Sequence, residues 1–160
     1  MLVFLGLGSN LEPNSHIALA LRSLTVTFGS LKKSRKYQTP AVGFIGPSFI
    51  NMVVSIDTEL SPAEVAESCQ RIERELGRDR SSESGSCSRC IDIDLLLFQD
   101  ESAKASDLPN PRKDIREFAY TAVPLADLIP DWQHEHTDGM RLVDFVQSGK
   151  FLDQKVEAID

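Results

Sequence analysis

Cysteine, long hydrophobic runs and a basic leader are scarce or missing in this sequence of 160 residues. The three cysteines are too few, and odd in number, to build a disulfide framework. No stretch approaches the roughly 18 apolar residues that a membrane-spanning helix needs. The first residues, MLVFLGLGSNLEPN, lack the basic region that begins a signal peptide. Together these features predict a cytoplasmic protein.

Positive charge is also in the minority, with 17 Lys and Arg residues against 24 Asp and Glu residues and a net charge of −7. This balance argues against a broad surface for nucleic acid or for an anionic membrane. We therefore expect small-molecule partners, with no nucleic acid and no membrane. We expect a monomer, with a homodimer as the alternative.

Two common nucleotide-binding signatures are absent. No G-x-x-x-x-G-K-[ST] loop occurs, and the turn at Gly6-Leu7-Gly8 lacks the third glycine of a dinucleotide-binding fingerprint. Any nucleotide chemistry must therefore use a site of another type.

The chain shows no internal repeat, low-complexity tract or linker, so we expect a single domain over residues 1–160. A domain of this length buries about two-thirds of its unfolded surface. Hydrophobic periodicity and turn residues predict its elements. These are strands over 2–7, 34–39, 49–57 and 90–98, helices over 17–28 and 61–77, and a helical segment over 115–128 interrupted at Pro124.

The first six of these elements follow one another as strand, helix, two strands, helix and strand. That order is typical of a ferredoxin-like α+β sandwich, or a close variant, with a mainly antiparallel sheet and helices packed on one face. The other face of the sheet is then free to hold a site.

Residues 89–98 read RCIDIDLLLF and place two acidic residues in an apolar strand. Because residues two apart point to the same side of a strand, Asp92 and Asp94 share one face, and Ile91 and Ile93 share the other. Two carboxylates about 7 Å apart repel unless a proton or a cation relieves them. Oxygen ligands on a strand suit Mg²⁺. The alternative is an edge strand whose acidic face is simply solvated.

Arginines are frequent around this pair. The hydrogen-bond donors of a guanidinium group match the geometry of phosphate oxygens. Two carboxylates with several arginines are therefore the groups that can bind a polyphosphate together with magnesium. Some of these arginines are expected to be ordinary surface residues. The arginines concerned are Arg78, Arg80, Arg89, Arg112 and Arg116.

The motif R-x-x-D-x-D-L-L that begins at Arg89 resembles the signature of the 6-hydroxymethyl-7,8-dihydropterin pyrophosphokinase family. Further blocks resemble the family in the same order over roughly residues 3–130: LGLGSNL, YQTPAVG, FIN, QRIERELGR and LPNPRKDIREFAYTAVPL. The resemblance implies a ferredoxin-like α+β fold. It also implies transfer of the pyrophosphoryl group of ATP to the hydroxymethyl oxygen of the pterin, with release of AMP, in folate biosynthesis.

The resemblance assigns roles to individual residues. It implies that Asp92 and Asp94 bind two Mg²⁺ ions, and that Arg78 and Arg89 are catalytic and hold the triphosphate. The residues implied to contact ATP are Gln70, Glu73, Arg80, Asn110, Arg112 and Arg116. The residues implied to bind the pterin are Thr39, Pro40, Val42, Phe49, Asn51 and Phe118.

The residues themselves agree with a pterin site in one respect. Phe49 and Asn51 share a strand face, so one can stack on a flat ring while the other hydrogen-bonds its edge. The alternative for Phe49 and Phe118 is an ordinary place in the core. The mid-strand amide of Asn51 needs polar partners in either case.

Several positions depart from the family pattern. The segment 81–88, SSESGSCS, lacks the tryptophan and basic residues that members usually carry there, and the only tryptophan is Trp132. Asn110 replaces a usual histidine, and Asp107 and Asp114 add negative charge. These changes predict weaker ATP binding or altered loop closure. Two alternatives to an active enzyme stay open: a non-catalytic pterin- or nucleotide-binding relative, and a ferredoxin-like interaction module without a ligand.

Two further clusters contain residue types that bind metals or take part in redox chemistry. Cys87 and Cys90 form a C-x-x-C that precedes a strand rather than a helix, which favours accidental spacing over redox or zinc chemistry. His134-Glu135-His136 is interpreted as part of a surface turn.

Overall fold

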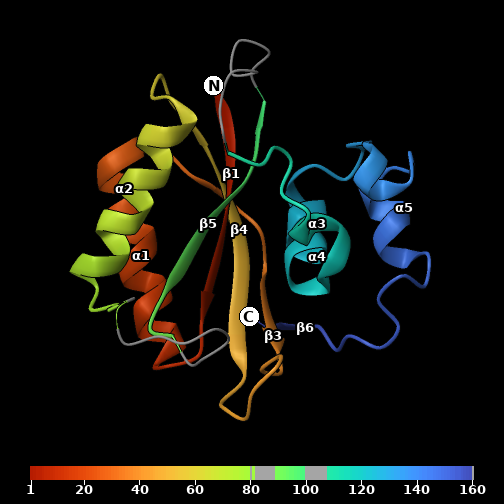
Figure 1. Cartoon of the computed structure of the whole chain (residues 1–160), viewed down its shortest axis with the longest axis horizontal. Coiled ribbons are helices and arrows are strands. Elements are labelled where there is room, and N and C mark those ends of the chain that lie inside the picture. The colour runs from red at the N-terminus through yellow and green to blue at the C-terminus, as the bar shows by residue number, and fades with distance from the viewer. Residues whose placement is uncertain (80, 82–88, 100–107, 160) are drawn as a thin grey trace.

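The computed structural model describes residues 1–79, 81, 89–99 and 108–159, and its elements are arranged in layers (Figure 1). The strands are β1 (Leu2–Ser9), β2 (Lys32–Lys33), β3 (Lys36–Thr39), β4 (Phe49–Asp57), β5 (Asp92–Gln99) and β6 (Glu157–Ile159). The helices are α1 (Pro13–Phe28), α2 (Pro62–Glu75), α3 (Asp114–Glu117), α4 (Ala119–Leu128) and α5 (Leu142–Gln147), with a 3₁₀ turn, η3 (Glu135–Thr137). None of the described helices is long and apolar enough to cross a membrane.

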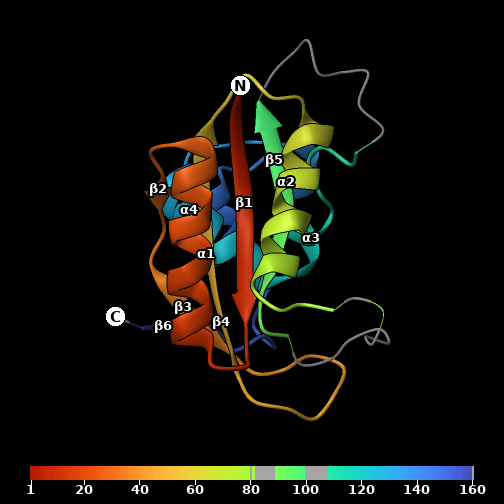
Figure 2. The same ribbon diagram turned by 90° about the vertical axis from the view of Figure 1, so that its left-hand side faces the viewer.

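The strands form one six-stranded sheet in the order β5-β1-β4-β3-β6, with β2 paired to β4. Every pairing is antiparallel. β1 lies between β4 and β5, and Figure 2 shows α1 and α2 lying on either side of it on one face of the sheet. The predicted ferredoxin-like α+β class is confirmed.

α2 shows why these residues form these elements. Ser61 accepts a hydrogen bond from the Glu64 backbone, and Glu64 accepts one from the Ser61 backbone, so the predicted capping box is present. The apolar side chains of α2 then face α1 and the sheet. Gly77, at φ +97°, follows the helix end in a conformation that favours glycine.

Side chains alternate along β4, as expected for the predicted strand over 49–57. Ile50, Met52, Val54 and Ile56 pack into the core between the sheet and α1 and α2. Val53 points to the opposite face. Strand periodicity thus separates the side chains that meet α1 and α2 from those on the other side.

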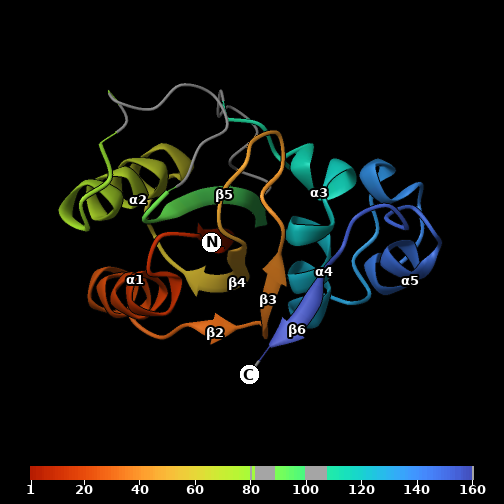
Figure 3. The same cartoon turned by 90° about the horizontal axis from the view of Figure 1, so that it is seen from below.

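That other face of the sheet is partly covered by helices, whereas the sequence predicted helices on one face only. A second core cluster joins Phe4, Val53, Leu97 and residues of α4 and α5, including Leu125 and Phe145. Figure 3 shows α4 and α5 on the side of the sheet opposite α1 and α2. Helices therefore lie on both faces, and the site occupies the part of this second face that α4 leaves open.

The helical segment predicted over 115–128 is interrupted at a different place. Phe118 has extended backbone angles and separates α3 from α4, whereas Pro124 lies inside α4. The Phe118 carbonyl accepts hydrogen bonds from Thr121 and Ala122, so a new helix begins there. The predicted interruption at Pro124 is therefore wrong, because the helix continues through this residue.

The alternation of side chains along β5 is interrupted partway along the strand. The register with β1 shifts between Phe4 and Leu5, so that Leu96 is an extra residue. Leu96 and Leu97 consequently both pack on the α4 side, and Phe98 turns to the α1 and α2 side. A bulge of this kind places two successive side chains against one partner residue.

The outer edge of β5 is satisfied by groups from outside the sheet. Asn110 accepts a hydrogen bond from the Phe98 N–H at 3.0 Å and donates one to the Phe98 carbonyl at 2.9 Å. The Arg112 N–H donates to the Leu96 carbonyl at 2.8 Å. Because both polar ends of its side chain bind β5, Asn110 has a structural role here, and its implied contact with ATP stays a prediction.

Replacing Asn110 with Ala is expected to lower the free energy of unfolding by roughly 1–2 kcal/mol, because two hydrogen bonds to β5 are lost. Urea denaturation measures the effect. Asn14→Ala, at an exposed position of α1, is the matched control and should change stability by less than about 0.5 kcal/mol. Unchanged stability of Asn110→Ala together with weaker ATP binding would contradict the structural role and support a contact of Asn110 with ATP.

Candidate active site

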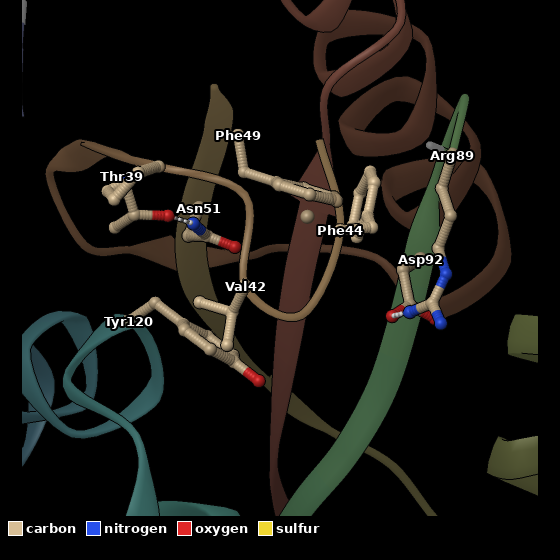
Figure 4. A pocket seen from close by; sticks show the side chains of 10 residues that line it. Thr39, Val42, Phe44, Phe49, Asn51, Arg89, Asp92 and Tyr120 are labelled. Atoms are coloured by element: carbon tan, nitrogen blue, oxygen red, sulfur yellow. Dashed lines mark hydrogen bonds and ion pairs between the residues drawn. The ribbon is translucent and has the colours of Figure 1, made fainter. Parts of the chain in front are cut away.

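Two cavities lie beside each other on the face of the sheet that α4 partly covers. The first, of about 110 Å³, is lined by Gly8, Thr39, Pro40, Val42, Phe44, Phe49, Asn51, Arg89, Asp92 and Tyr120 (Figure 4). The second, of about 40 Å³, is lined by Gly6, Leu7, Gly8, Asn51, Met52, Val53, Asp92, Asp94, Leu96, Asp114, Tyr120 and Thr121. The two share four residues, so a ligand in one lies directly against the other.

The floor between the cavities is glycine backbone. Gly6 and Gly8 of β1 stand opposite Asp94 and Asp92 of β5. A Cβ at Gly8 would lie 3.0 Å from Asn51 Oδ1, tighter than ordinary van der Waals contact. Glycine therefore keeps the surface between Asn51 and the aspartates open. The sequence indicated these glycines as an incomplete dinucleotide motif and as part of the LGLGSNL block, but it did not reveal this role.

Five of the six residues implied to bind the pterin line the first cavity: Thr39, Pro40, Val42, Phe49 and Asn51. The Asn51 amide nitrogen donates to Thr39 Oγ1 at 2.7 Å. Its carbonyl oxygen points into the cavity (Figure 4). The cavity thus combines apolar side chains with an oriented amide.

Phe118, the sixth of these residues, does not line either cavity. Its ring stacks on Tyr120, with centroids 4.9 Å apart and planes 14° apart. Tyr120 lines both cavities, and Phe44 lines the first, edge-on to Phe49. Neither Tyr120 nor Phe44 is among the site residues predicted from the sequence, although Tyr120 is part of the FAYTAVPL block and Phe44 follows YQTPAVG directly.

Both aspartates of β5 face the cavities, as the strand alternation predicted. Asp92 accepts hydrogen bonds from Arg78 at 2.5 Å and from Arg89 at 2.7 Å. Asp94 accepts one from Arg112 at 2.7 Å, and Arg112 also binds Asp114 at 3.1 Å. β5 is an edge strand, but its acidic face is an ion-pair network rather than a solvated surface.

The charged form of Asp94 is disfavoured in spite of its arginine partner. Burial, followed by the charge of Asp92, raises the pKa of Asp94 to about 6, although Arg112 opposes the shift. Asp114 and Glu73 raise this pKa further. A site with several carboxylate oxygens and a destabilised anion fits a divalent cation with oxygen ligands, so these residues are suited to hold Mg²⁺.

Beneath Asp92 lies a buried ion pair between the end of α2 and β5. Glu73 and Arg78 are 1% and 5% exposed, and their side chains meet at 2.9 Å. Glu73 also accepts a hydrogen bond from the Ile93 N–H at 2.7 Å, and Arg78 donates to the Ile91 carbonyl at 3.2 Å. The pair therefore fixes both the start of β5 and the orientation of Asp92.

Glu73 and Arg78 are held within the fold here. Glu73 is enclosed, and Arg78 is directed at Glu73 and Asp92, while the roles toward ATP that the resemblance implies for both residues stay predictions. The turn at Gly77 brings Arg78 back under β5. Through these contacts the two residues hold Asp92 and the start of β5 in position.

The remaining residues implied to contact ATP lie farther out or beyond the described chain. Gln70 is exposed on α2. Arg116 binds Asp138 at 2.7 Å and the His136 carbonyl at 3.1 Å. Arg80 lies outside the described residues, as does Cys87 of the C-x-x-C motif.

Glu135 and His136 lie in η3 and His134 is its N-cap, so the segment forms a turn, as predicted. Its three candidate ligand atoms lie within 4.8 Å of one another. His134 Nδ1, however, accepts a hydrogen bond from the His136 N–H, and His136 Nε2 lies 3.2 Å from the Pro111 carbonyl. These ring nitrogens already serve the turn and its packing on the 108–112 segment.

The turn after β1 ties the site together. The Arg89 N–H donates to Asn10 Oδ1 at 2.7 Å, and Ser9 Oγ donates to the Cys90 carbonyl at 2.5 Å. Asn10 also donates to the Pro47 carbonyl at 3.1 Å, which anchors the loop that carries Val42 and Phe44. Ser9 and Asn10 thus hold the start of β5 and this loop in place.

Comparisons with known proteins agree with this architecture. The model of the 7,8-dihydro-6-hydroxymethylpterin-pyrophosphokinase (HPPK) family matches residues 4–130. Two relatives are named 2-amino-4-hydroxy-6-hydroxymethyldihydropteridine pyrophosphokinase. The one from Methylorubrum extorquens is 39% identical, over 80% of this chain and 82% of its own length. The one from Bacillus subtilis is 34% identical, over 85% of this chain and 83% of its own length.

Solved structures show the same fold. An HPPK-DHPS chain in complex with substrates matches with a TM-score of 0.68 and 13% identity, over 92% of this chain. The HPPK-DHPS of Plasmodium falciparum matches with a TM-score of 0.67 and 11% identity. This chain spans only 43% and 45% of the length of those two chains. The chain belongs to the 7,8-dihydro-6-hydroxymethylpterin-pyrophosphokinase family.

Replacing Glu73 with Ala is expected to lower the free energy of unfolding by about 3–5 kcal/mol, because the buried charge of Arg78 loses a partner. Urea denaturation is the measurement. Glu75→Ala, at an exposed position of the same helix, is the control and should change stability by less than about 0.5 kcal/mol. Equal stability of the two variants would contradict the supporting role of Glu73.

Proposed function

We propose that this member of the pyrophosphokinase family transfers the pyrophosphoryl group of ATP to the hydroxymethyl oxygen of 6-hydroxymethyl-7,8-dihydropterin, releasing AMP, in folate biosynthesis. One observation carries the proposal within the structure. The apolar cavity with an oriented amide shares Asp92 with the cavity that holds the carboxylate pair. A ring bound in the first cavity therefore presents its substituent to the acidic groups of the second.

The pterin ring would occupy the first cavity. Phe49 and Val42 offer apolar contact to the ring faces, and Asn51 Oδ1 offers an acceptor to the N–H groups at the ring edge. The hydrogen bond from Asn51 to Thr39 holds the amide in this orientation, so its carbonyl oxygen is presented before the substrate arrives. Such preorganisation reduces the entropy that binding would cost.

Asp92 and Asp94 would hold Mg²⁺, and we expect two ions. Bound there, Mg²⁺ would offset the negative charge of the phosphate oxygens. Arg89 and Arg112, with side chains 26% and 35% exposed, are the arginines placed to turn from the aspartates toward the phosphates. Arg78 would stay in its buried pair and keep Asp92 in position.

The chain would act mainly by positioning and charge neutralisation. The hydroxymethyl oxygen attacks the β-phosphorus and loses its proton to water, the bond from this phosphorus to the oxygen of the α-phosphate breaks, and AMP leaves. Groups on β1, β4, β5 and α4 line the two cavities and bring the reactants together. Monomeric state and cytoplasmic location stay predictions of the sequence.

The non-catalytic alternative gains no support from the described residues. The expected metal ligands and Arg89 all line the cavities. Asn110, which departs from the family pattern, binds β5 without blocking either cavity. Of the other departures, Asp107 and most of the 81–88 segment lie outside the described residues.

The first test measures AMP release from ATP and Mg²⁺ with and without the pterin. Pterin-dependent release of AMP is the expected result. Absence of AMP from a sample that binds the pterin would favour the non-catalytic relative.

Asp94→Asn is expected to lower turnover at least about 100-fold while leaving pterin affinity within about twofold, because the substitution removes a metal ligand outside the first cavity. The comparison uses AMP release for turnover and calorimetry for pterin binding. Asp153→Asn, at an exposed position beyond both cavities, should behave as wild type. Normal turnover by Asp94→Asn would refute the metal assignment.

A further inference from the structure

Tyr120 occupies a fixed position between the two cavities. It lies in the first turn of α4, on the part of the helix nearest the site. Its ring stacks on Phe118 at a centroid distance of 4.9 Å, which restricts the ring orientation. Figure 4 shows its hydroxyl directed away from α4 into the space on the Asp92 side. The position of this hydroxyl is therefore set before any ligand binds.

The four residues that both cavities share are Gly8, Asn51, Asp92 and Tyr120. Gly8 has no side chain, Asn51 presents a carbonyl oxygen, and Asp92 is held by two arginines. Tyr120 supplies the only hydroxyl of this group. Across the described part of the chain, that hydroxyl makes no hydrogen bond, and the ring contact of Tyr120 is with Phe118.

A tyrosine hydroxyl is protonated at neutral pH, and the surroundings of Tyr120 favour this form further. Burial, followed by the charges of Asp114, Asp94 and Asp92, raises its pKa to about 12. Arg112 opposes this shift. At neutral pH the group is thus a hydrogen-bond donor, and a ligand oxygen at the junction of the cavities is a suitable acceptor.

The chain's other tyrosine provides a contrast. Tyr37 on β3 donates to Asp127 at 2.9 Å and accepts a hydrogen bond from Arg35 at 2.8 Å. It lines neither cavity. One tyrosine hydroxyl is therefore used within the fold, and the other is presented to the site.

We propose that Tyr120 is a specificity-determining residue whose hydroxyl donates a hydrogen bond to the hydroxymethyl oxygen of the pterin. This inference rests on the proposed function. A ring held by Asn51 in the first cavity reaches the second through its hydroxymethyl group, and Tyr120 stands where the two cavities meet. The bond selects pterins that carry this oxygen and holds it beside the carboxylate pair. Tyr120 is not the proton acceptor in this role.

The test compares two ligands on two proteins. Calorimetry, with Mg²⁺ and an unhydrolysable ATP analogue present, measures the affinities of 6-hydroxymethyl-7,8-dihydropterin and 6-methyl-7,8-dihydropterin. Wild type should prefer the hydroxymethyl compound, and Tyr120→Phe should reduce this preference by roughly three- to tenfold, the range for one neutral hydrogen bond. A role in packing alone would change both affinities together and leave their ratio intact.

Tyr37→Phe is the matched control, since it removes the other tyrosine hydroxyl. It should lower the melting temperature through loss of the bond to Asp127 and keep the wild-type ratio of affinities. An equal ratio in wild type and Tyr120→Phe would overturn the role of Tyr120, with the proposed function intact. Failure of wild type to release AMP in the presence of the pterin would overturn both.

Discussion

The site depends on keeping two carboxylates at one face of a strand whose other face is buried. Ile91 and Ile93 fix β5 against the core of α1 and α2, so Asp92 and Asp94 must face the cavities. Such charges are tolerated only with partners close by. The buried Glu73–Arg78 pair supplies one end of this support, because it binds both the backbone of β5 and Asp92.

Because β5 is an edge strand, its unpaired backbone groups also need partners. Glu73 and Arg78 cover the beginning of the edge, while Asn110 and the Arg112 N–H cover its end. An edge covered in this way is protected from pairing with another chain. The same side chains thus satisfy the strand and surround the acidic groups, and this connects the stability of the fold with the chemistry of the site.

Features that follow from local pattern could be predicted from the sequence. Strand alternation predicted the shared face of Phe49 and Asn51 and that of Asp92 and Asp94, and motif resemblance identified most of the first cavity. Features that depend on how distant segments meet could not be predicted. The glycine floor requires the register of β1 against β5, and the burial of Arg78 requires the turn after α2. The cavity position of Tyr120 likewise depends on where α4 begins.

The most direct test of this account is a crystal structure with Mn²⁺ in place of Mg²⁺, an unhydrolysable ATP analogue and the pterin. Anomalous scattering then locates each bound ion. The account predicts peaks within roughly 2–2.5 Å of the carboxylate oxygens of Asp92 and Asp94, with the pterin ring beside Asn51. A peak at His134 and His136 instead, with Asp92 and Asp94 still bound only to their arginines, would contradict it.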